Sequence, residues 1–282
     1  MICKWESYLS LLPLWLRKKA GETGAERLLE LRLRCGLPVE AVTTNGSVWF
    51  TEKICEQDLN YVINMASKYS PWTTSGIGDC YITAEGGHRI GICGQVAVKD
   101  DQLAGVTFPT SISVRVSKDF SGIATTACSL KGSVLIIGPP GSGKTTFLRD
   151  FVRQKSDREE GCIGVVDEKS EIFPKAGRFF AFYPGKRTDV LSGCQKASGI
   201  LRVLKNMTPR VIATDEITAK EDCQALLHAA WCGVMLIATA HAGSRSDLMN
   251  RPVYRELLSA EIFDQLIIMD RNFGWHLEGL CL

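Results

Sequence analysis

The second half of the chain alternates short apolar runs with amphipathic segments. The apolar runs predict buried strands, at residues 133–137, 162–166, 211–213, 234–240 and 266–269. Between them, residues 145–154 suit a helix, and Cys223, Leu226, Leu227 and Ala230 are spaced as one stripe of another helix. Buried strands separated by helices are typical of a parallel sheet that is covered on both faces. We therefore expect an α/β domain here.

The first part of the chain shows a different pattern. We expect helices at about 5–19 and 24–31, followed by short strands. Residues 89–98 alternate apolar with small side chains, and residues 111–117 alternate strictly, so that their apolar positions face one way. This is typical of a smaller α+β domain with an antiparallel sheet.

We place the domains at residues 1–125 and 126–282, and expect the first to serve docking or regulation. The composition is ordinary for a globular protein, with 45% hydrophobic and 23% charged residues. The net charge of +2 gives no reason to expect a nucleic-acid partner. The eleven cysteines are scattered and form no CxxC pair. We interpret most of them as small apolar side chains in a reducing compartment.

No stretch reaches the roughly 18 continuous apolar residues that a membrane span needs, so we expect a cytoplasmic protein. The apolar segment Leu9–Leu16 is too short for a span. Two interpretations of it stay open. Trp5, Leu12 and Trp15 pack one helix face on the core, or the segment lies on a membrane surface or docks on a partner.

The segment between the expected strand at 133–137 and the following helix matches the phosphate-loop pattern GxxxxGK[ST] in full. With the next residue it comprises Gly138, Pro139, Pro140, Gly141, Ser142, Gly143, Lys144, Thr145 and Thr146. Glycines let the backbone bend around an anion, and the helix start adds its positive dipole end. We expect Lys144 to reach the β- and γ-phosphates and Thr145 to offer its hydroxyl to Mg²⁺.

Two acidic pairs end expected strands, at Asp167-Glu168 and at Asp215-Glu216. The carboxyl ends of parallel strands meet at one edge of the sheet, where the phosphate loop also lies. A phosphate-loop enzyme needs one acid to hold Mg²⁺ through water and a second to polarise the attacking water. We assign these roles to Asp215 and Glu216. For each pair the alternative is a strand-end acid that caps the next helix.

Two further side chains are candidates for catalysis. His241 follows the expected strand at 234–240, so it should lie near the γ-phosphate and could sense whether that phosphate is present. Arg187 lies in the basic turn 185–189 and could stabilise transition-state charge, in its own site or across a subunit interface. The alternatives are a structural histidine and a solvated turn.

The order of these motifs resembles a known family. The phosphate loop, Val-Asp-Glu-Lys-Ser-Glu-Ile at 166–172, Gly-Lys-Arg-Thr-Asp at 185–189 and the two later motifs around Asp215 and His241 follow the pattern of the stage III sporulation AA proteins, ATPases of endospore-forming bacteria. Residues 30–38 and Gly86-Gly87-His88 are similar to the amino-terminal half of that family, so the resemblance covers roughly residues 25–270. Thr214 departs from it, because a larger apolar residue is more typical before the acidic pair.

That family is in turn similar to the hexameric ATPases of type II and type IV secretion and pilus systems. The resemblance implies a RecA-like P-loop NTPase domain of AAA+ type that uses ATP and Mg²⁺, in a homo-oligomer, as a hexameric ring. It implies catalytic roles for Glu168, Glu216 and His241. It also implies a mother-cell protein, held at the membrane by docking on a membrane protein of the sporulation channel.

Three functions therefore compete. The first is an ATPase that powers or assembles a membrane-embedded, secretion-like channel during endospore formation. The second is a nucleic-acid-stimulated RecA-like ATPase, which would need a basic groove bearing aromatic side chains. The third is an assembly scaffold that is gated by nucleotide and turns over slowly. The near-neutral charge counts against the second.

Overall fold

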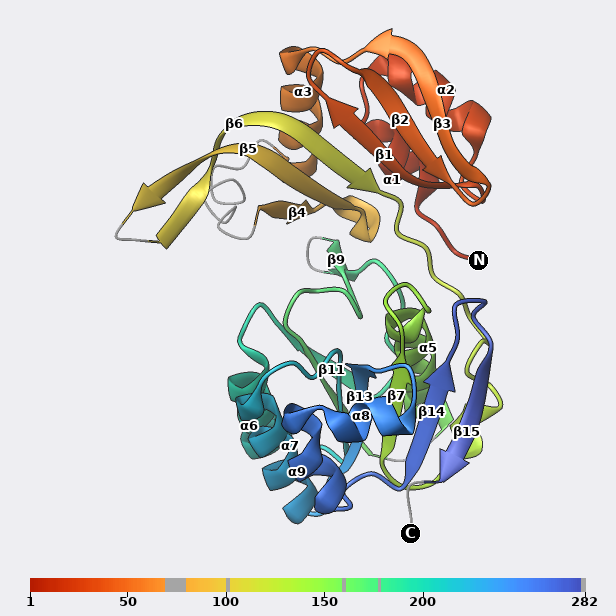
Figure 1. Cartoon of the computed structure of the whole chain (residues 1–282), viewed down its shortest axis with the longest axis vertical. Coiled ribbons are helices and arrows are strands. Elements are labelled where there is room, and N and C mark those ends of the chain that lie inside the picture. The colour runs from red at the N-terminus through yellow and green to blue at the C-terminus, as the bar shows by residue number, and fades with distance from the viewer. Residues whose placement is uncertain (69–79, 100–101, 159–160, 177–178, 280–282) are drawn as a thin grey trace. The chain divides into compact units, whose positions relative to one another are not determined.

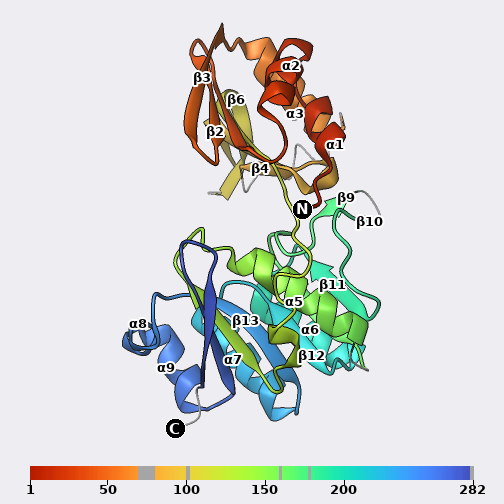
Figure 2. The ribbon, with the colours of Figure 1, turned by 90° about the vertical axis from the view of Figure 1, so that its right-hand side faces the viewer.

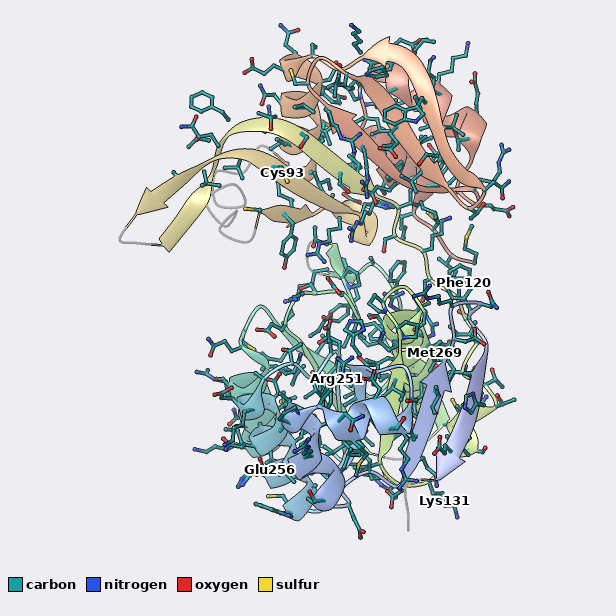
Figure 3. The ribbon with its side chains drawn as sticks, in the orientation of Figure 1. Cys93, Phe120, Lys131, Arg251, Glu256 and Met269 are labelled. Carbon is teal, nitrogen blue, oxygen red and sulfur yellow. The ribbon has the colours of Figure 1, made fainter. Side chains whose placement is uncertain are left out.

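The structure is a computed structural model that describes residues 1–68, 80–99, 102–158, 161–176 and 179–279. The chain forms two compact units, each with its own sheet (Figure 1). The first unit comprises Met1–Asp119 together with Pro174–Phe182. The second comprises Phe120–Phe173 and Tyr183–Leu282, and Phe120, where it begins, is labelled in Figure 3. No pattern in the sequence indicated that residues 174–182 join the first unit.

The first unit is a six-stranded antiparallel sheet in the order β3-β2-β1-β6-β5-β4. Its strands are β1 (Leu28–Arg34), β2 (Pro38–Thr43), β3 (Gly46–Lys53), β4 (Tyr81–Thr83), β5 (Arg89–Lys99) and β6 (Gln102–Arg115). Its helices are α1 (Trp5–Ser10), α2 (Leu14–Thr23) and α3 (Glu56–Ser67). Apolar side chains of the helices and of one sheet face form a single core. The expected α+β domain with an antiparallel sheet is therefore present.

Residues 24–31 are not the expected helix, because β1 begins at Leu28. Leu28 and Leu31 lie three residues apart, which fits a helix stripe, but both are buried as part of a strand that continues through Leu33. β1 pairs with β2 on one side and with β6 on the other. Pairing with β2 and with β6, which is distant in sequence, outweighs the local pattern.

The expected helix at 5–19 is present as two helices, α1 and α2. They are separated before Leu14 by Pro13, the N-cap residue of α2. Leu12 is fully buried, and Trp5 and Trp15 pack against the core of the first unit. The interpretation that this apolar segment packs on the core is therefore confirmed. Among the described residues, no helix combines the length and the hydrophobicity that crossing a bilayer requires.

In the motif Gly86-Gly87-His88, the histidine contacts the segment before α1 and the segment after β6. His88 is buried, and one of its ring nitrogens, Nε2, lies 3.0 Å from the main-chain oxygen of Lys4. The other, Nδ1, accepts a 3.1 Å hydrogen bond from the N–H of Ser117, just after β6. Gly86 has φ +85°, and a Cβ there would come within 2.8 Å of both the His88 ring and Lys4. Only glycine suits that position.

The second unit contains a seven-stranded sheet in the order β11-β8-β12-β13-β7-β14-β15. Its strands are β7 (Val134–Gly138), β8 (Ile163–Asp167), β11 (Thr188–Ser192), β12 (Val211–Thr214), β13 (Met235–His241), β14 (Gln265–Met269) and β15 (Trp275–Gly279). All neighbours are parallel except β14 and β15, which form an antiparallel hairpin. The mainly parallel sheet expected for this part of the chain is confirmed.

Helices cover both faces of this sheet, as Figures 1 and 2 show. The helices are α5 (Lys144–Arg158), α6 (Lys196–Met207), α7 (Lys220–Trp231), α8 (Arg245–Asn250) and α9 (Pro252–Ser259). Leu135 and Ile137 of β7 belong to the core formed with α6, α7 and α9, whereas α5 contacts β7 and β13 from the other face. Alternate side chains of a strand point to opposite faces, so continuous apolar strands fill both cores.

Candidate nucleotide-binding site

The phosphate-loop segment links β7 to α5 at the carboxyl edge of the parallel sheet. Gly141 and Gly143 have φ values of +79° and +85°, which side-chain-bearing residues rarely adopt. At Gly138 a Cβ would lie 2.5 Å from Ser142 Oγ and 2.7 Å from the main-chain oxygen of Met269. The loop therefore needs glycine for its backbone turns and for its close packing. The first N–H groups of α5 are free of intrahelical partners, as in any helix start.

Two observations test whether this loop fits a triphosphate. The Nζ of Lys144 is folded back onto the loop and donates hydrogen bonds to the main-chain oxygens of Gly138, at 2.8 Å, and Pro139, at 2.9 Å. Ser142 Oγ is buried and has no hydrogen-bond partner among the described residues. A buried hydroxyl without a partner is costly unless a ligand or water supplies one. The loop thus has the donors and the unfilled polar group that bound phosphates would use.

His241 lies beside the loop, since it pairs in register with Gly138 across β13 and β7. Its Nδ1 is 3.0 Å from Lys144 Nζ, and its Nε2 is 3.1 Å from Glu216 Oε1. The imidazole thus connects the loop lysine with a carboxylate on the next strand end. Burial lowers the pKa of Lys144, while the charge of Glu216 opposes that effect.

Asp215 and Glu216 directly follow β12, whose neighbours are β8 and β13. Asp215 is buried, which raises the pKa of its carboxyl to about 6. The Lys196 ammonium opposes this rise, and the charges of Asp167 and Glu171 add to it. The side-chain oxygens of Asp215 and Glu216 and the hydroxyl of Thr145 are oxygen ligands of the kind that Mg²⁺ prefers. The set therefore fits a magnesium ion held with phosphates and water.

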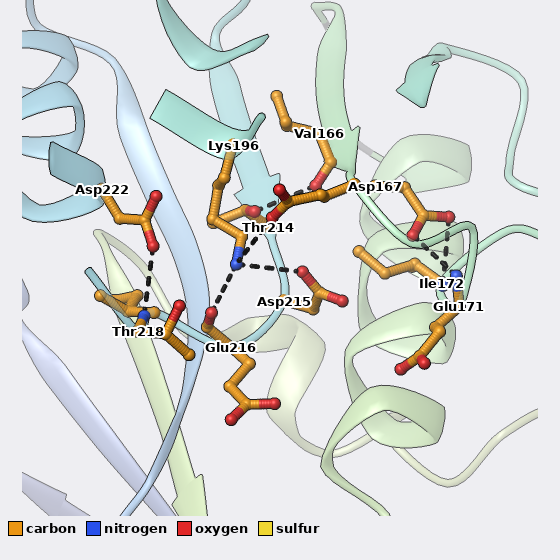
Figure 4. A network of polar contacts seen from close by, with 12 residues as sticks. Val166, Asp167, Glu171, Ile172, Lys196, Thr214, Asp215, Glu216, Thr218 and Asp222 are labelled. Carbon is orange, nitrogen blue, oxygen red and sulfur yellow. Dashed lines mark hydrogen bonds and ion pairs between the residues drawn. The ribbon is translucent and has the colours of Figure 1, made fainter. Parts of the chain in front are cut away.

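Asp167 and Glu168 differ in what they contact. The carboxylate of Asp167 is buried and accepts hydrogen bonds from three consecutive main-chain N–H groups, of Glu171, Ile172 and Phe173. It therefore shapes the turn after β8, as Figure 4 shows for two of these residues. The side chain of Glu168 is 37% exposed and faces Lys196 at 4.0 Å. The Asp167 carboxylate, whose charge also acts on Asp215, is thus engaged by the turn, whereas the Glu168 carboxylate faces the cation beside the Asp215-Glu216 segment.

The departure from the family pattern at Thr214 has a structural explanation. Thr214 is buried, and its hydroxyl donates a 3.0 Å hydrogen bond to the main-chain oxygen of Val166 on β8. A buried hydroxyl with a partner costs little, so threonine is accommodated there. The bond fixes the end of β12 against β8, directly before Asp215.

Arg187 is not brought together with the loop of its own chain. It immediately precedes β11, whose first residue Thr188 pairs with Ile163, the first residue of β8. Arg187 therefore lies at the amino edge of the parallel strands, whereas the loop lies at the carboxyl edge. It is exposed, and its guanidinium donates a 3.4 Å hydrogen bond to the main-chain oxygen of Ser156.

The site also contains a residue that we did not expect from the sequence. Lys196, the first residue of α6, is buried, and its ammonium donates a hydrogen bond to the main-chain oxygen of Glu216. It lies 3.5 Å from Asp215 Oδ1 (Figure 4). The available signal was the spacing of Ile200, Val203 and Leu204, which fits one stripe of a helix, but the strand before that helix gave no pattern that would place Lys196 at the carboxyl edge of the sheet.

Comparison with known proteins supports the same fold and family. The chain matches the family described as "Sporulation stage III, protein AA" over residues 3–276. It is 33% identical over 277 residues to stage III sporulation protein AA of Bacillus subtilis (strain 168), covering 94% of this chain and 90% of that protein.

Among solved structures, it is similar to the ATPase DotB of Legionella pneumophila, with a TM-score of 0.61 and 15% identity over 91% of this chain and 76% of DotB. It is also similar to the pilus retraction motor PilT with bound ADP, with a TM-score of 0.62 and 14% identity over 95% of this chain and 78% of PilT. The second unit thus has the RecA-like P-loop fold of secretion and pilus ATPases, as expected. From its family match and its Bacillus relative, the chain belongs to the sporulation stage III protein AA family.

Proposed function

We propose that this chain is a Mg²⁺-dependent ATPase that powers or assembles a membrane-embedded, secretion-like channel during endospore formation. One observation carries the proposal. The imidazole of His241 lies within 3.0 Å of Lys144 and 3.1 Å of Glu216, so the loop and the acidic strand end share one cluster of contacts. A phosphate-loop hydrolase needs its loop lysine and a group that positions the attacking water at one site, and this cluster brings Lys144 and Glu216 together.

Each residue then has a role that follows from its position. The loop N–H groups and Lys144 would bind the β- and γ-phosphates, and Ser142 would gain a partner. Thr145, and Asp215 through water, would hold Mg²⁺, which neutralises phosphate charge when bound. Glu216 would polarise the attacking water, and Glu168 is the second candidate for this task.

His241 would report on the γ-phosphate, because a ligand that draws Lys144 onto phosphate oxygens removes one of the two contacts of the imidazole. The ring would then be free to shift with Glu216. In a homo-oligomer this change could pass to a neighbouring subunit. The preference for ATP rests on the similarity to the DotB and PilT proteins.

The assembly part of the proposal rests on the family and on the position of Arg187. We propose a hexameric ring in the mother-cell cytoplasm, docked through a membrane protein of the sporulation channel. Because Arg187 lies at the sheet edge opposite its own loop, only the site of an adjacent subunit could use its guanidinium. Nucleic acid is not a partner in this proposal, in keeping with the net charge of +2.

An affinity purification from membranes of sporulating cells tests the proposed role. The Glu216→Gln variant, trapped with ATP, should retain a membrane protein that is absent when ADP replaces ATP. The Lys144→Ala variant serves as the matched control, since it should not retain the partner with either nucleotide. Equal recovery with ATP, with ADP and with Lys144→Ala would show that nucleotide does not govern docking.

A further inference from the structure

Lys196 occupies an unusual place for a cation. It is the first residue of α6, where the positive end of the helix dipole disfavours a basic side chain. Its side chain is only 4% exposed. A buried ammonium at a helix start is stable only when anions or carbonyl oxygens surround it. The position therefore indicates that its partners hold it there.

Those partners all belong to the candidate catalytic cluster. The ammonium donates to the main-chain oxygen of Glu216 and lies 3.5 Å from Asp215 Oδ1 and 4.0 Å from Glu168 Oε2. An ammonium carries three N–H donors, which matches these three acceptors. Figure 4 shows Lys196 between the end of β12 and the turn that follows β8. One side chain thus contacts all three acidic residues proposed for magnesium and water.

The position of Lys196 is set by tight packing of α6 on β8. A Cβ on Gly199 of α6 would lie 2.6 Å from Val166 Cγ1, and one on Gly164 of β8 would lie 2.3 Å from Val203 Cγ1. Two glycines, one on each element, therefore allow the helix to approach the strand closely. Val203 and Val166 both belong to the buried core. Lys196 is consequently held on a rigid element and not on a loop.

We propose that Lys196 is a positioning residue for the magnesium segment, which it ties to α6 through the Glu216 carbonyl and the Asp215 carboxylate. It also balances the charge of the carboxylates when no Mg²⁺ is bound. This proposal rests on the proposed nucleotide site, but it concerns this chain's own residues. Groups that orient metal ligands typically contribute about 10–100-fold to metal affinity or activity.

The proposal predicts different effects on two quantities, the affinity for nucleotide without Mg²⁺ and the gain in affinity that Mg²⁺ provides. Within the described part of the chain, the ammonium of Lys196 contacts Glu216, Asp215 and Glu168 and makes no hydrogen bond or ion pair with the phosphate loop, so its loss should leave nucleotide affinity without Mg²⁺ almost unchanged. The gain in affinity that Mg²⁺ provides depends on Asp215, and should shrink. A residue that only stabilises the fold would lower both affinities together.

The test measures the equilibrium Kd of a fluorescent ATP analogue on the full chain, with EDTA and with saturating Mg²⁺. Three variants of Lys196 distinguish the contribution of its hydrogen-bond donors from that of its positive charge. Lys196→Met removes donor and charge, Lys196→Gln keeps a donor, and Lys196→Arg keeps both. Lys205→Met is the matched control, because Lys205 lies on the same helix and is exposed.

We expect Lys196→Met to lose at least about tenfold of the Mg²⁺-dependent gain, with its Kd in EDTA within about threefold of the unchanged chain. The Mg²⁺-dependent gain of Lys196→Gln should lie between that of Lys196→Met and that of the unchanged chain. The gains of Lys196→Arg and Lys205→Met should be closest to that of the unchanged chain. If Lys196→Met does not fold by circular dichroism, Lys196→Gln decides the matter. The proposal is overturned if Lys196→Met, or Lys196→Gln where Lys196→Met does not fold, keeps the gain within about twofold, or if its affinities with and without Mg²⁺ fall by the same factor.

The outcome is distinguishable from failure of the proposed function. If the unchanged chain binds the analogue with a Mg²⁺-dependent gain but releases no phosphate, the ATPase assignment fails while the assignment of Lys196 is still decided by the variants. If the unchanged chain hydrolyses ATP and every Lys196 variant keeps the full gain, the assignment of Lys196 alone fails.

Discussion

His241 places its Nε2 3.1 Å from a carboxylate oxygen of Glu216, across the ends of two neighbouring parallel strands. The same ring contacts Lys144 through Nδ1 at 3.0 Å. A histidine with both nitrogens engaged in this way has a fixed orientation. The contact joins the two halves of the candidate site, and the predictions about catalysis follow from it.

Glu216→Gln should bind ATP as well as the unchanged chain but hydrolyse it at least about 100-fold more slowly, because an amide cannot accept the proton of the attacking water. Nucleotide binding by fluorescence and phosphate release under saturating MgATP would measure the two effects separately. Glu168→Gln is the matched comparison. If Glu168→Gln loses the rate and Glu216→Gln keeps it, the assignment of the base is wrong.

His241→Ala should leave ATP affinity within about threefold and lower turnover by roughly 10–100-fold, because Glu216 and Lys144 lose their common partner. His228→Ala is a suitable control, since His228 is exposed on α7. Steady-state hydrolysis of ATP over a range of concentrations gives both quantities. A His241→Ala variant with the turnover of the control would contradict a role in the cycle.

Arg187→Ala should lower turnover only in the assembled oligomer, because Arg187 cannot reach the loop of its own chain. Mixed with Glu216→Gln subunits, it should regain part of the activity. Some interfaces would then combine an intact arginine with an intact glutamate. The measurement is ATPase rate against mixing ratio, with assembly followed by light scattering. Strict additivity of the two inactive proteins would argue against a role across subunits.

The stability of the first unit should fall in mild acid because of His88. Burial lowers the pKa of this imidazole from its usual 6.5 to about 4, while its contact with Lys4 opposes the shift. Nδ1 must stay unprotonated to accept from Ser117. The unfolded chain binds a proton below pH 6.5 and the folded unit does not, so His88 disfavours folding increasingly as the pH falls from 6.5 towards 4.

The loss in free energy of unfolding should reach on the order of 3 kcal/mol once the pH is below the pKa of His88 in the folded unit. Urea unfolding of the first unit at about pH 7.5 and about pH 5 measures most of it. His88→Asn removes the titrating group, so its free energy of unfolding should vary less over this range. The same variation in both proteins would assign the effect to other groups.

The parts of the site that the sequence predicted are those set by local chemistry. The loop from Gly138 to Thr145 carries its own turns and donors, and its pattern needs no information from elsewhere in the chain. Asp215 and Glu216 come just after the apolar run 211–213 and Thr214, which placed them at the carboxyl edge of a parallel sheet. His241 could be placed for the same reason.

The parts that could not be predicted depend on contacts distant in sequence. Leu28 and Leu31 fit a helix as well as a strand, and the pairing of β1 with β2 and with the distant β6 decides between them. β11 is a half-buried strand with polar residues and no clear alternation, so nothing in residues 188–192 indicated a strand. Without β11 and α6, neither the edge position of Arg187 nor the buried position of Lys196 could be anticipated.

The most direct test of the account is the rate of phosphate release from MgATP by the purified chain and its Lys144→Ala variant. Lys131→Ala provides the control, since Lys131 is exposed just before β7 (labelled in Figure 3). We predict that the unchanged chain and Lys131→Ala release phosphate at the same rate, and that Lys144→Ala is at least about 100-fold slower. Turnover by Lys144→Ala at the rate of the unchanged chain would contradict the assignment of the site.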